Sequence, residues 1–296
     1  MAKNKTFKLT ALILVVVVAV ASALMFIKSD DKADAESSPS AKMYVDFIDV
    51  GQGDCTLLRT DDTVILVDAG ESGSADDVVS YLKENGISKI DCCIATHPHS
   101  DHIGALPEVF ENFEIDTVII PDISEENEPT TRIYEKFLLS LENAKTVLPS
   151  LGGEEYTFGD FSIEILGPVN QYDDLNDMSI VARVSYKDTS VMLTGDAETP
   201  SEEDILKVVN KSDLSSDILK LGHHASRTST SDEWLASVDP EFAVISCGLD
   251  NDYGHPHKET IEKLENYGVV YYRTDLVGSV TFESDGKQFT LIENDN

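Results

Sequence analysis

Side chains that commonly bind metal ions are concentrated in one short stretch of the sequence. Residues 96–102 read Thr-His-Pro-His-Ser-Asp-His and follow an apolar run that ends at Ala95. Imidazole and carboxylate groups suit zinc, iron or manganese. Where a buried strand ends before a helix, His97 and His99 can point to one side, while Asp101 and His102 reach a second point nearby. The spacing therefore predicts two ions side by side, a pair of the kind that supports hydrolysis at a separation of about 3.5–4 Å.

The other histidines support the same interpretation. All seven histidines of the chain fall in three clusters, namely residues 97–102, His223 with His224, and His255 with His257. Histidines without a shared role would be scattered along the chain. A chance group of core or surface histidines is therefore the weaker explanation.

The elements that must position these residues are predicted from apolar patterns. Alternating or continuous apolar runs indicate strands, and apolar residues at helical spacing indicate helices. The predicted strands are Tyr44–Val50, Cys55–Arg59, Val64–Val67, Ile90–Ala95, Thr117–Ile120, Phe161–Leu166, Ile180–Tyr186, Val191–Thr194 and Ile218–Leu221, with closing strands that reach Ile292. Helices are predicted at Ala75–Glu84, Asp101–Phe113 and Thr130–Asn143 and after Pro200. Two mixed halves of this kind predict an α/β fold, a sandwich of two sheets with helices outside.

The cysteines carry little of the predicted chemistry. Four cysteines are too few for a disulfide scaffold in a chain of 296 residues. Cys92 and Cys93 lie inside an apolar run, so both are predicted to be small core residues. A disulfide that involves Cys55 or Cys247 stays open.

Together the motifs resemble those of the metallo-β-lactamase superfamily. The similarity begins with His-x-His-x-Asp-His after a buried strand and with Asp68 at the end of the upstream run Ile65–Val67. It narrows to the hydrolase domain of ComEC-type DNA-uptake proteins, because further motifs follow in matching order. These are residues 47–54 (Phe-Ile-Asp-Val-Gly-Gln-Gly-Asp), 194–196 (Thr-Gly-Asp), 223–226 (His-His-Ala-Ser) and 253–256 (Tyr-Gly-His-Pro). The resemblance covers Met43 to Ile292 and implies the two-sheet αββα fold, although bacterial choline-binding phosphodiesterases have a similar core.

The resemblance also implies roles for individual residues. The implied metal ligands are His97 and His99 for one ion, Asp101 and His102 for the other, Asp196 as the bridge, and His224. His223 is expected beside the substrate as a catalytic residue, and which of His223 and His224 binds metal stays open. Asp68 is expected to support the ligands from behind, with a turn residue before Gly70 as the alternative. The implied cofactors are two divalent metal ions, zinc in the first place and manganese as the alternative.

Some positions depart from the expected pattern. The wider superfamily has another histidine ligand in the middle of the chain, where this sequence has Asn176 and Asp177. Either residue could fill the place directly or through water, or Asp177 could cap a helix or strand. ComEC-type proteins often have Asp where this chain has His99, so the metal preference leans towards zinc. Ala225 replaces the usual Gly of the His-His-Gly-Ser motif.

The expected mechanism follows from the two ions. They would lower the pKa of a bridging water and provide a hydroxide nucleophile, which Asp101 can orient. His255 could donate a proton or a hydrogen bond to the developing charge. His257 could assist or cap the following helix, and Ser226 could line the pocket or cap a helix. Asp54 is expected to hydrogen-bond into the Gly-Gln-Gly turn that it follows.

The charge of the chain bears on its substrate. The sequence has 55 acidic and 22 basic residues and a formal charge of −33. A nonspecific binder of polyanions normally presents a basic groove. Nucleic acid is therefore a disfavoured substrate, and a smaller phosphodiester fits better. The alternatives are an acyl or β-lactam hydrolase and a non-catalytic, metal-stabilised surface domain that binds a partner.

The N-terminal region is predicted to lie outside the catalytic fold. Three lysines precede an apolar run from Ala11 to Ile27, so residues 1–28 are expected to be a signal peptide or a membrane anchor, with an uncleaved anchor favoured. Cleavage after Ala23 or Ala35 is the alternative. Residues 29–42 are expected to be a flexible linker and residues 43–296 the hydrolase domain. The basic residues before the run place the N-terminus inside and the domain outside the cytoplasmic membrane.

Overall fold

The computed structural model describes residues 42–292 of the chain. The predicted signal or anchor segment and residues 29–41 of the predicted linker lie outside the described residues. Within residues 42–292, no helix combines the length and the apolar character needed to cross a bilayer.

Two β-sheets form the centre of the described unit, as the sequence predicts. The first sheet has eight strands in the order β15-β14-β1-β2-β3-β4-β5-β6. Its strands are β1 Met43–Phe47, β2 Thr56–Arg59, β3 Val64–Val67, β4 Lys89–Ile94, β5 Glu114–Pro121, β6 Ala144–Ser150, β14 Val280–Ser284 and β15 Phe289–Ile292. The two closing strands therefore return to the sheet built by the first half of the chain, beside β1.

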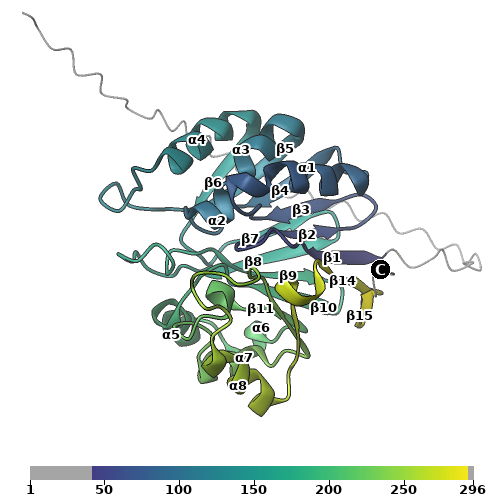
Figure 1. Cartoon of the computed structure of the whole chain (residues 1–296), viewed down its shortest axis with the longest axis vertical. Coiled ribbons are helices and arrows are strands. Elements are labelled where there is room, and N and C mark those ends of the chain that lie inside the picture. Colours follow the sequence, from purple (N-terminus) through teal and green to yellow (C-terminus); the bar gives the residue numbers. More distant parts are fainter. Residues whose placement is uncertain (1–41, 293–296) are drawn as a thin grey trace, which may run out of the picture. The chain divides into compact units, whose positions relative to one another are not determined.

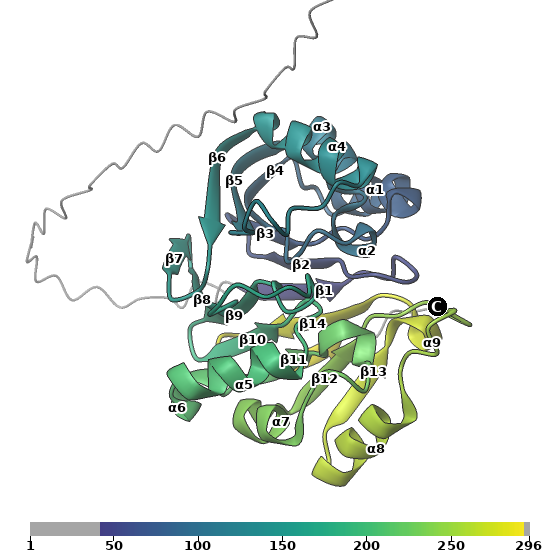
Figure 2. The ribbon, with the colours of Figure 1, turned by 90° about the vertical axis from the view of Figure 1, so that its left-hand side faces the viewer.

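The second sheet has seven strands in the order β13-β12-β11-β10-β9-β8-β7. Its strands are β7 Glu155–Phe158, β8 Phe161–Gly167, β9 Val181–Tyr186, β10 Thr189–Leu193, β11 Ile218–Lys220, β12 Phe242–Ile245 and β13 Val270–Arg273. The helices are α1 Ala75–Glu84, α2 Ser100–Ile103, α3 Leu106–Asn112, α4 Arg132–Ser140, α5 Thr199–Val208, α6 Lys211–Leu214, α7 Asp232–Val238, α8 Lys258–Tyr267 and α9 Thr274–Val277. Figures 1 and 2 show α1 to α4 on the outer face of the first sheet and α5, α7 and α8 on that of the second.

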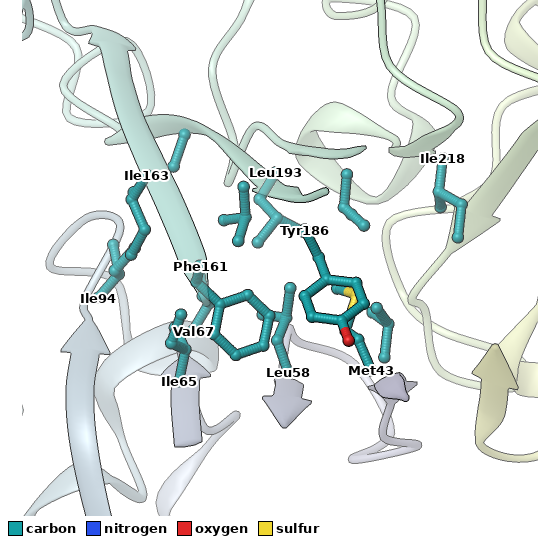
Figure 3. Close-up of a cluster of buried hydrophobic side chains, with 14 of the residues drawn as sticks. Met43, Leu58, Ile65, Val67, Ile94, Phe161, Ile163, Tyr186, Leu193 and Ile218 are labelled. Atoms are coloured by element: carbon teal, nitrogen blue, oxygen red, sulfur yellow. The ribbon is translucent and has the colours of Figure 1, made fainter. Parts of the chain in front are cut away.

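The apolar core has three layers because successive strand residues point to opposite faces of a sheet. Leu58 packs between the sheets with Phe161 and Tyr186 (Figure 3), whereas its neighbour Leu57 packs under the helices of the first sheet. Cys92 and Cys93 divide in the same way. All four cysteines are free and buried, which confirms the prediction for this pair and leaves Cys55 and Cys247 without a disulfide.

The sheets bring the loops with the predicted ligands to one place. Strands β3, β4 and β5 run parallel in the first sheet, and β10, β11 and β12 run parallel in the second. Within each group the loops that follow the strands leave from the same end. Backbone hydrogen bonds tie the loop after β4 and the helix that follows it to two other segments: Ile180 N, just before β9, donates to Thr96 O at 2.8 Å, and Asp54 N, between β1 and β2, donates to Asp101 O at 3.1 Å. The site is therefore assembled between the two sheets.

Several predicted elements differ from the observed ones. The predicted helix Asp101–Phe113 is two helices, α2 and α3, that are separated at Gly104 and Ala105. A side chain at Gly104 would collide with the backbone of Ser72, so this turn passes close to the preceding loop. Strands β6 and β7 are not among the strands predicted from the sequence. Both are edge strands with many exposed residues, so their apolar pattern is weak.

Candidate metal centre

Four of the predicted ligands form one compact group. The donor atoms of Asp101, His102, Asp196 and His224 all lie within 4.8 Å of one another. His102 Nε2 is 3.2 Å from Asp196 Oδ1, and His224 Nε2 is 3.2 Å from Asp101 Oδ2. Among the described residues, His102 Nε2 and Asp196 Oδ1 are buried without a hydrogen-bond partner. Two imidazole nitrogens and two carboxylates around buried, unpaired atoms fit a divalent cation.

His97 and His99 lie beside this group and are less enclosed by other donors. His97 Nε2 is 3.1 Å from His99 Nδ1 and 3.8 Å from Asp196 Oδ2. Burial lowers the pKa of His97 well below its usual value, and the neighbouring His102 adds to this. His97 is therefore neutral, which is the form that binds metal. The pair can begin a second ion site, and the carboxylate of Asp196 lies within 3.8 Å of His97 Nε2 and 3.2 Å of His102 Nε2.

A carboxylate holds His102 from behind. Asp68 Oδ2 lies 2.8 Å from His102 Nδ1, so His102 presents Nε2 to the compact group. Thr96 fixes this carboxylate through its backbone N–H at 2.8 Å and its hydroxyl at 2.6 Å. Burial raises the pKa of Asp68, and His102 opposes that shift. Asp68 therefore fixes the ring orientation of His102, which is what a carboxylate behind a metal-binding imidazole would do.

A second carboxylate, which the sequence analysis missed, holds His223. Glu198 Oε1 lies 2.8 Å from His223 Nδ1 and accepts a hydrogen bond from the Thr228 hydroxyl at 2.8 Å. The other ring nitrogen, His223 Nε2, is 3.8 Å from Asp196 Oδ2. The only sequence signal is that Glu198 follows the predicted bridge Asp196 by two positions.

A buried ion pair lies behind His224. Lys220 is 1% exposed, and its Nζ is 2.7 Å from Asp54 Oδ2. Asp54 Oδ1 is 3.3 Å from His224 Nδ1, which lies 2.8 Å from the carbonyl oxygen of Ser246. The expectation that Asp54 bonds into its own turn is therefore wrong. The carboxylate turns inward because Lys220, in the middle of the second sheet, has no other carboxylate partner among the described residues.

The turn that carries both histidines has an unusual backbone. His223, His224 and Ala225 have positive φ angles of 47°, 53° and 64°. Such angles are unfavourable for residues other than glycine, at about 1–2 kcal/mol each. Hydrogen bonds hold the turn, since Ser229 Oγ donates to Gly222 O at 2.6 Å and His223 N donates to Gly195 O at 3.1 Å. A strained segment with two imidazoles is typical of a functional site.

Ala225→Gly is expected to change the free energy of unfolding by less than about 1 kcal/mol. Glycine removes the unfavourable left-handed conformation of Ala225, worth about 1–2 kcal/mol. It also loosens the unfolded chain by about 0.4–1 kcal/mol and removes a buried methyl group worth about 0.8 kcal/mol. Urea unfolding of the variant and the wild type measures the difference. A loss above about 2 kcal/mol would show that the packing of this methyl group outweighs backbone strain.

Three of the remaining predicted residues, Asp177, His257 and Ser226, bond outside the cavity that adjoins the metal centre. Asp177 accepts hydrogen bonds from the backbone N–H groups of Glu198 at 3.1 Å and Ser201 at 3.3 Å, so it caps the start of α5 instead of facing the metal centre. His257 is the N-cap residue of α8 and accepts from the backbone N–H of Arg227 at 3.0 Å. The Ser226 hydroxyl is 2.9 Å from the Thr228 hydroxyl, within the turn.

His255 does line the cavity beside the metal centre. Its Nδ1 is buried without a hydrogen-bond partner among the described residues, and Tyr253 stacks on its ring at 5.7 Å. Burial lowers the pKa of His255 to about 4, and the neighbouring His224 and His223 add to the shift. His255 is therefore a neutral imidazole at pH 7.

The cavity over these residues has a volume of about 420 Å³. Its lining is Gln52, Pro98, His99, Ser100, Asp101, Thr131, Ile133, Asn176, Asp196, His223, His224, Tyr253 and His255. No lysine or arginine is in this set of described residues. A neighbouring cavity of about 800 Å³ shares Gln52 and Tyr253 with it. Six carboxylates line that neighbour: Asp49, Glu71, Asp77, Asp250, Asp252 and Asp275.

Comparison with known proteins shows the family and the fold of the chain. Residues 48–248 match the family model described as "Metallo-beta-lactamase superfamily". The crystal structure of the metallo-beta-lactamase fold protein YhfI from Bacillus subtilis aligns with a TM-score of 0.54 at 15% identity, and covers 82% of this chain and 100% of that one. These matches confirm the predicted αββα sandwich.

Relatives of the ComEC type match most of the chain, which confirms the second part of the predicted resemblance. The chain is 27% identical over 265 residues to ComE operon protein 3 of Bacillus subtilis (82% of this chain, 33% of that protein). It is 32% identical over 245 residues to Recombination protein 2 of Haemophilus influenzae (80% of this chain, 28% of that protein). The chain thus spans about a third of the length of these relatives. A shorter match, 29% identical over 115 residues, is to exodeoxyribonuclease YycJ of Bacillus anthracis (39% of this chain, 40% of that protein).

Proposed function

Because this chain belongs to the metallo-beta-lactamase superfamily, we propose that it is a metal-dependent hydrolase of phosphodiesters. One observation carries the proposal. Asp101, His102, Asp196 and His224 converge within 4.8 Å, while His102 Nε2 and Asp196 Oδ1 remain buried and without hydrogen bonds. A group of this kind without a cation would leave buried polar atoms unpaired, which is unfavourable.

Two ions would be held by the residues already described. Asp101, His102 and His224 would bind one ion, His97 and His99 would begin the site of the other, and Asp196 would bridge them. Divalent ions bound there would lower the pKa of a coordinated water and neutralise charge on a phosphoryl oxygen. Zinc suits this nitrogen-rich set of donors, and manganese is the alternative.

The protein side chains orient the reacting groups. Asp101 lies at the mouth of the site, where its carboxylate can accept a hydrogen bond from the attacking water. His255 lines the same cavity and has a buried ring nitrogen without a partner among the described residues. It can donate a hydrogen bond to a phosphoryl oxygen as negative charge develops. His223 faces Asp196 and lies on the same cavity wall.

The surroundings of the site favour a small phosphodiester over nucleic acid. The cavity lining includes no lysine or arginine among the described residues, and the adjoining cavity is lined by six carboxylates. A long polyanion would run along this acidic surface and be repelled. The similarity to an exodeoxyribonuclease supports phosphodiester hydrolysis as the reaction. It does not bear on whether the substrate is small or a long polymer.

Turnover of two substrates tests the proposal. We expect the full chain, purified in mild detergent and supplied with zinc or manganese, to hydrolyse bis(p-nitrophenyl) phosphate. Hydrolysis of single-stranded DNA is expected to be slower, and its kcat/KM should not fall as salt rises from about 50 to 200 mM, because the described linings of the two cavities offer no lysine or arginine from which counterions would be released.

Other outcomes would change the assignment. A steep loss of DNA cleavage with salt would point to a DNA nuclease instead. Cleavage of a thioester or a β-lactam without phosphodiester turnover would favour the acyl alternative. An ion-loaded chain without any turnover would favour a binding domain.

We also propose that the enzyme acts outside the cytoplasmic membrane. The support is the sequence alone, in which lysines precede the apolar run from Ala11 to Ile27. Membrane attachment through an uncleaved segment is the form of this proposal that the length of the run favours.

A further inference from the structure

We propose that Glu198 is a positioning residue. It holds Asn176 and His223 so that both can be ligands of the ion that His97 and His99 would also bind. We also infer that this ion is the more weakly bound of the two. The inference rests on the proposed function, because it requires a metal centre. Asn176 and His223 would take the place of the histidine ligand that the wider superfamily has in the middle of the chain and that this sequence lacks.

Glu198 is the acceptor for three side chains at once. Its Oε1 lies 2.8 Å from His223 Nδ1, and it accepts from the Thr228 hydroxyl at 2.8 Å and from the Asn176 amide nitrogen at 3.4 Å. An ionised carboxylate can only accept hydrogen bonds, so His223 must carry its proton on Nδ1. His223 Nε2 then has a free lone pair, and it lies 3.8 Å from Asp196 Oδ2.

The same carboxylate fixes the orientation of Asn176. Since the amide nitrogen faces Glu198, the amide oxygen Oδ1 must lie on the other arm of the side chain. Asn176 is 9% exposed, and Oδ1 has no hydrogen-bond partner among the described residues. Asn176 lines the cavity together with His99 and His223. A buried acceptor without a partner at a cavity wall calls for a ligand.

The backbone places Asn176 near the first ion site. Residue Ile180 pairs with Thr96, which directly precedes His97, and the Ser179 hydroxyl accepts from the backbone N–H of Asp196 at 3.0 Å. The segment from Asn176 to Ile180 therefore runs beside both the first histidine cluster and the bridging carboxylate.

The two ion sites differ in the charge of their donors. The compact group contributes two carboxylates, those of Asp101 and Asp196, and all its donor atoms converge. The other site has imidazoles, the neutral amide of Asn176 and a share of Asp196. Fewer negative ligands bind a divalent ion less tightly. We therefore expect unequal affinities.

Titration of the full chain with zinc at buffered free concentrations tests this inference. The wild type is expected to bind two ions, one more tightly than the other. Asn176→Ala and Glu198→Gln should each weaken the second ion by about 10–100-fold, while the first changes by less than about threefold. Asn176→Asp, which keeps an oxygen at this position and adds a charge, should tighten the second ion. Asn210→Ala, at an exposed asparagine before α6, is the matched control and should leave both affinities unchanged.

The outcomes separate this inference from the proposed function. Two ions with unchanged affinities in Asn176→Ala and Glu198→Gln would overturn the inference and leave the hydrolase proposal standing. An equal loss of both ions would also overturn it, because it would indicate a merely structural role. If Asn176→Ala does not fold by circular dichroism, the direction of the change in Asn176→Asp decides. A wild-type chain that binds no ion would instead overturn the proposed function itself.

Discussion

Asp196→Ala is expected to abolish binding of both ions and to lower kcat/KM for a phosphodiester by about a thousandfold or more, which corresponds to about 4 kcal/mol. The carboxylate of Asp196 faces four imidazoles, at 3.2 Å from His102 Nε2, 3.6 Å from His224 Nε2, and 3.8 Å from both His97 Nε2 and His223 Nε2. Its removal takes the shared negative charge from both ion sites. Asp101 is then the only carboxylate in the compact group, and the site of His97 and His99 has none, so both sites bind a divalent cation less well.

The fold should survive this substitution. The backbone N–H of Asp196 donates to the Ser179 hydroxyl at 3.0 Å, and this hydrogen bond does not involve the side chain that the substitution removes. Metal content, turnover and circular dichroism are measured together, with Asp188→Ala in the exposed β9–β10 turn as the control. Asp196→Ala protein that still holds two ions per chain would contradict the bridging role.

Lys220→Met is expected to destabilise the protein by about 3–5 kcal/mol, because it leaves the carboxylate of Asp54 buried without its lysine partner. Lys220 and Asp54 are 1% and 4% exposed, and their charged atoms are 2.7 Å apart. Burial raises the pKa of Asp54. The neighbouring Lys220 and His224 lower it by more than burial raises it, so the pKa lies below its ordinary value. The contribution of the pair is therefore present at neutral pH and is lost only as the pH falls below the ordinary pKa of aspartic acid.

A double variant separates loss of the pair from loss of packing. Asp54→Asn combined with Lys220→Met should recover most of the stability, to within about 1–2 kcal/mol of the wild type, since no charge then stays buried alone. Urea unfolding in the presence of a chelator gives the values without a contribution from bound metal. Lys207→Met, at a lysine whose side chain is 66% exposed, is the control and should change stability by less than about 1 kcal/mol. If Lys220→Met changes the free energy of unfolding no more than this control does, the ion pair does not stabilise the fold.

The sequence predicts those parts of the site whose ligands lie close together along the chain. The cluster from His97 to His102 and the pair His223 and His224 are visible because metal ligands at the ends of buried strands leave dense local patterns. The two-sheet sandwich is also predictable, since the buried strands are nearly continuous apolar runs. The edge strands β6 and β7 are not, because one side of each faces solvent.

The supporting groups depend on contacts between distant segments, and the sequence does not reveal them. Lys220 is hidden inside the apolar run Ile218–Leu221, although a lone lysine in a buried strand already requires a buried partner. That partner, Asp54, lies more than 160 positions away. Glu198 belongs to no recognisable motif. Its contact with His223 Nδ1 joins residues 25 positions apart and is visible only in the structure. Asp177 is a further example, because its position suggests a metal ligand, whereas its side chain accepts hydrogen bonds from the start of α5, 21 and 24 positions along the chain.

The most direct test of the central claim is the metal content of the purified full chain after equilibration with buffered zinc. The account predicts two ions per wild-type chain and fewer than one in Asp196→Ala. It predicts one ion per chain in Asn176→Ala, held by the compact group, at a free zinc concentration that gives two in the wild type. A wild-type chain that takes up no zinc or manganese at saturating concentrations would contradict the account of the metal centre and, with it, the proposed hydrolysis.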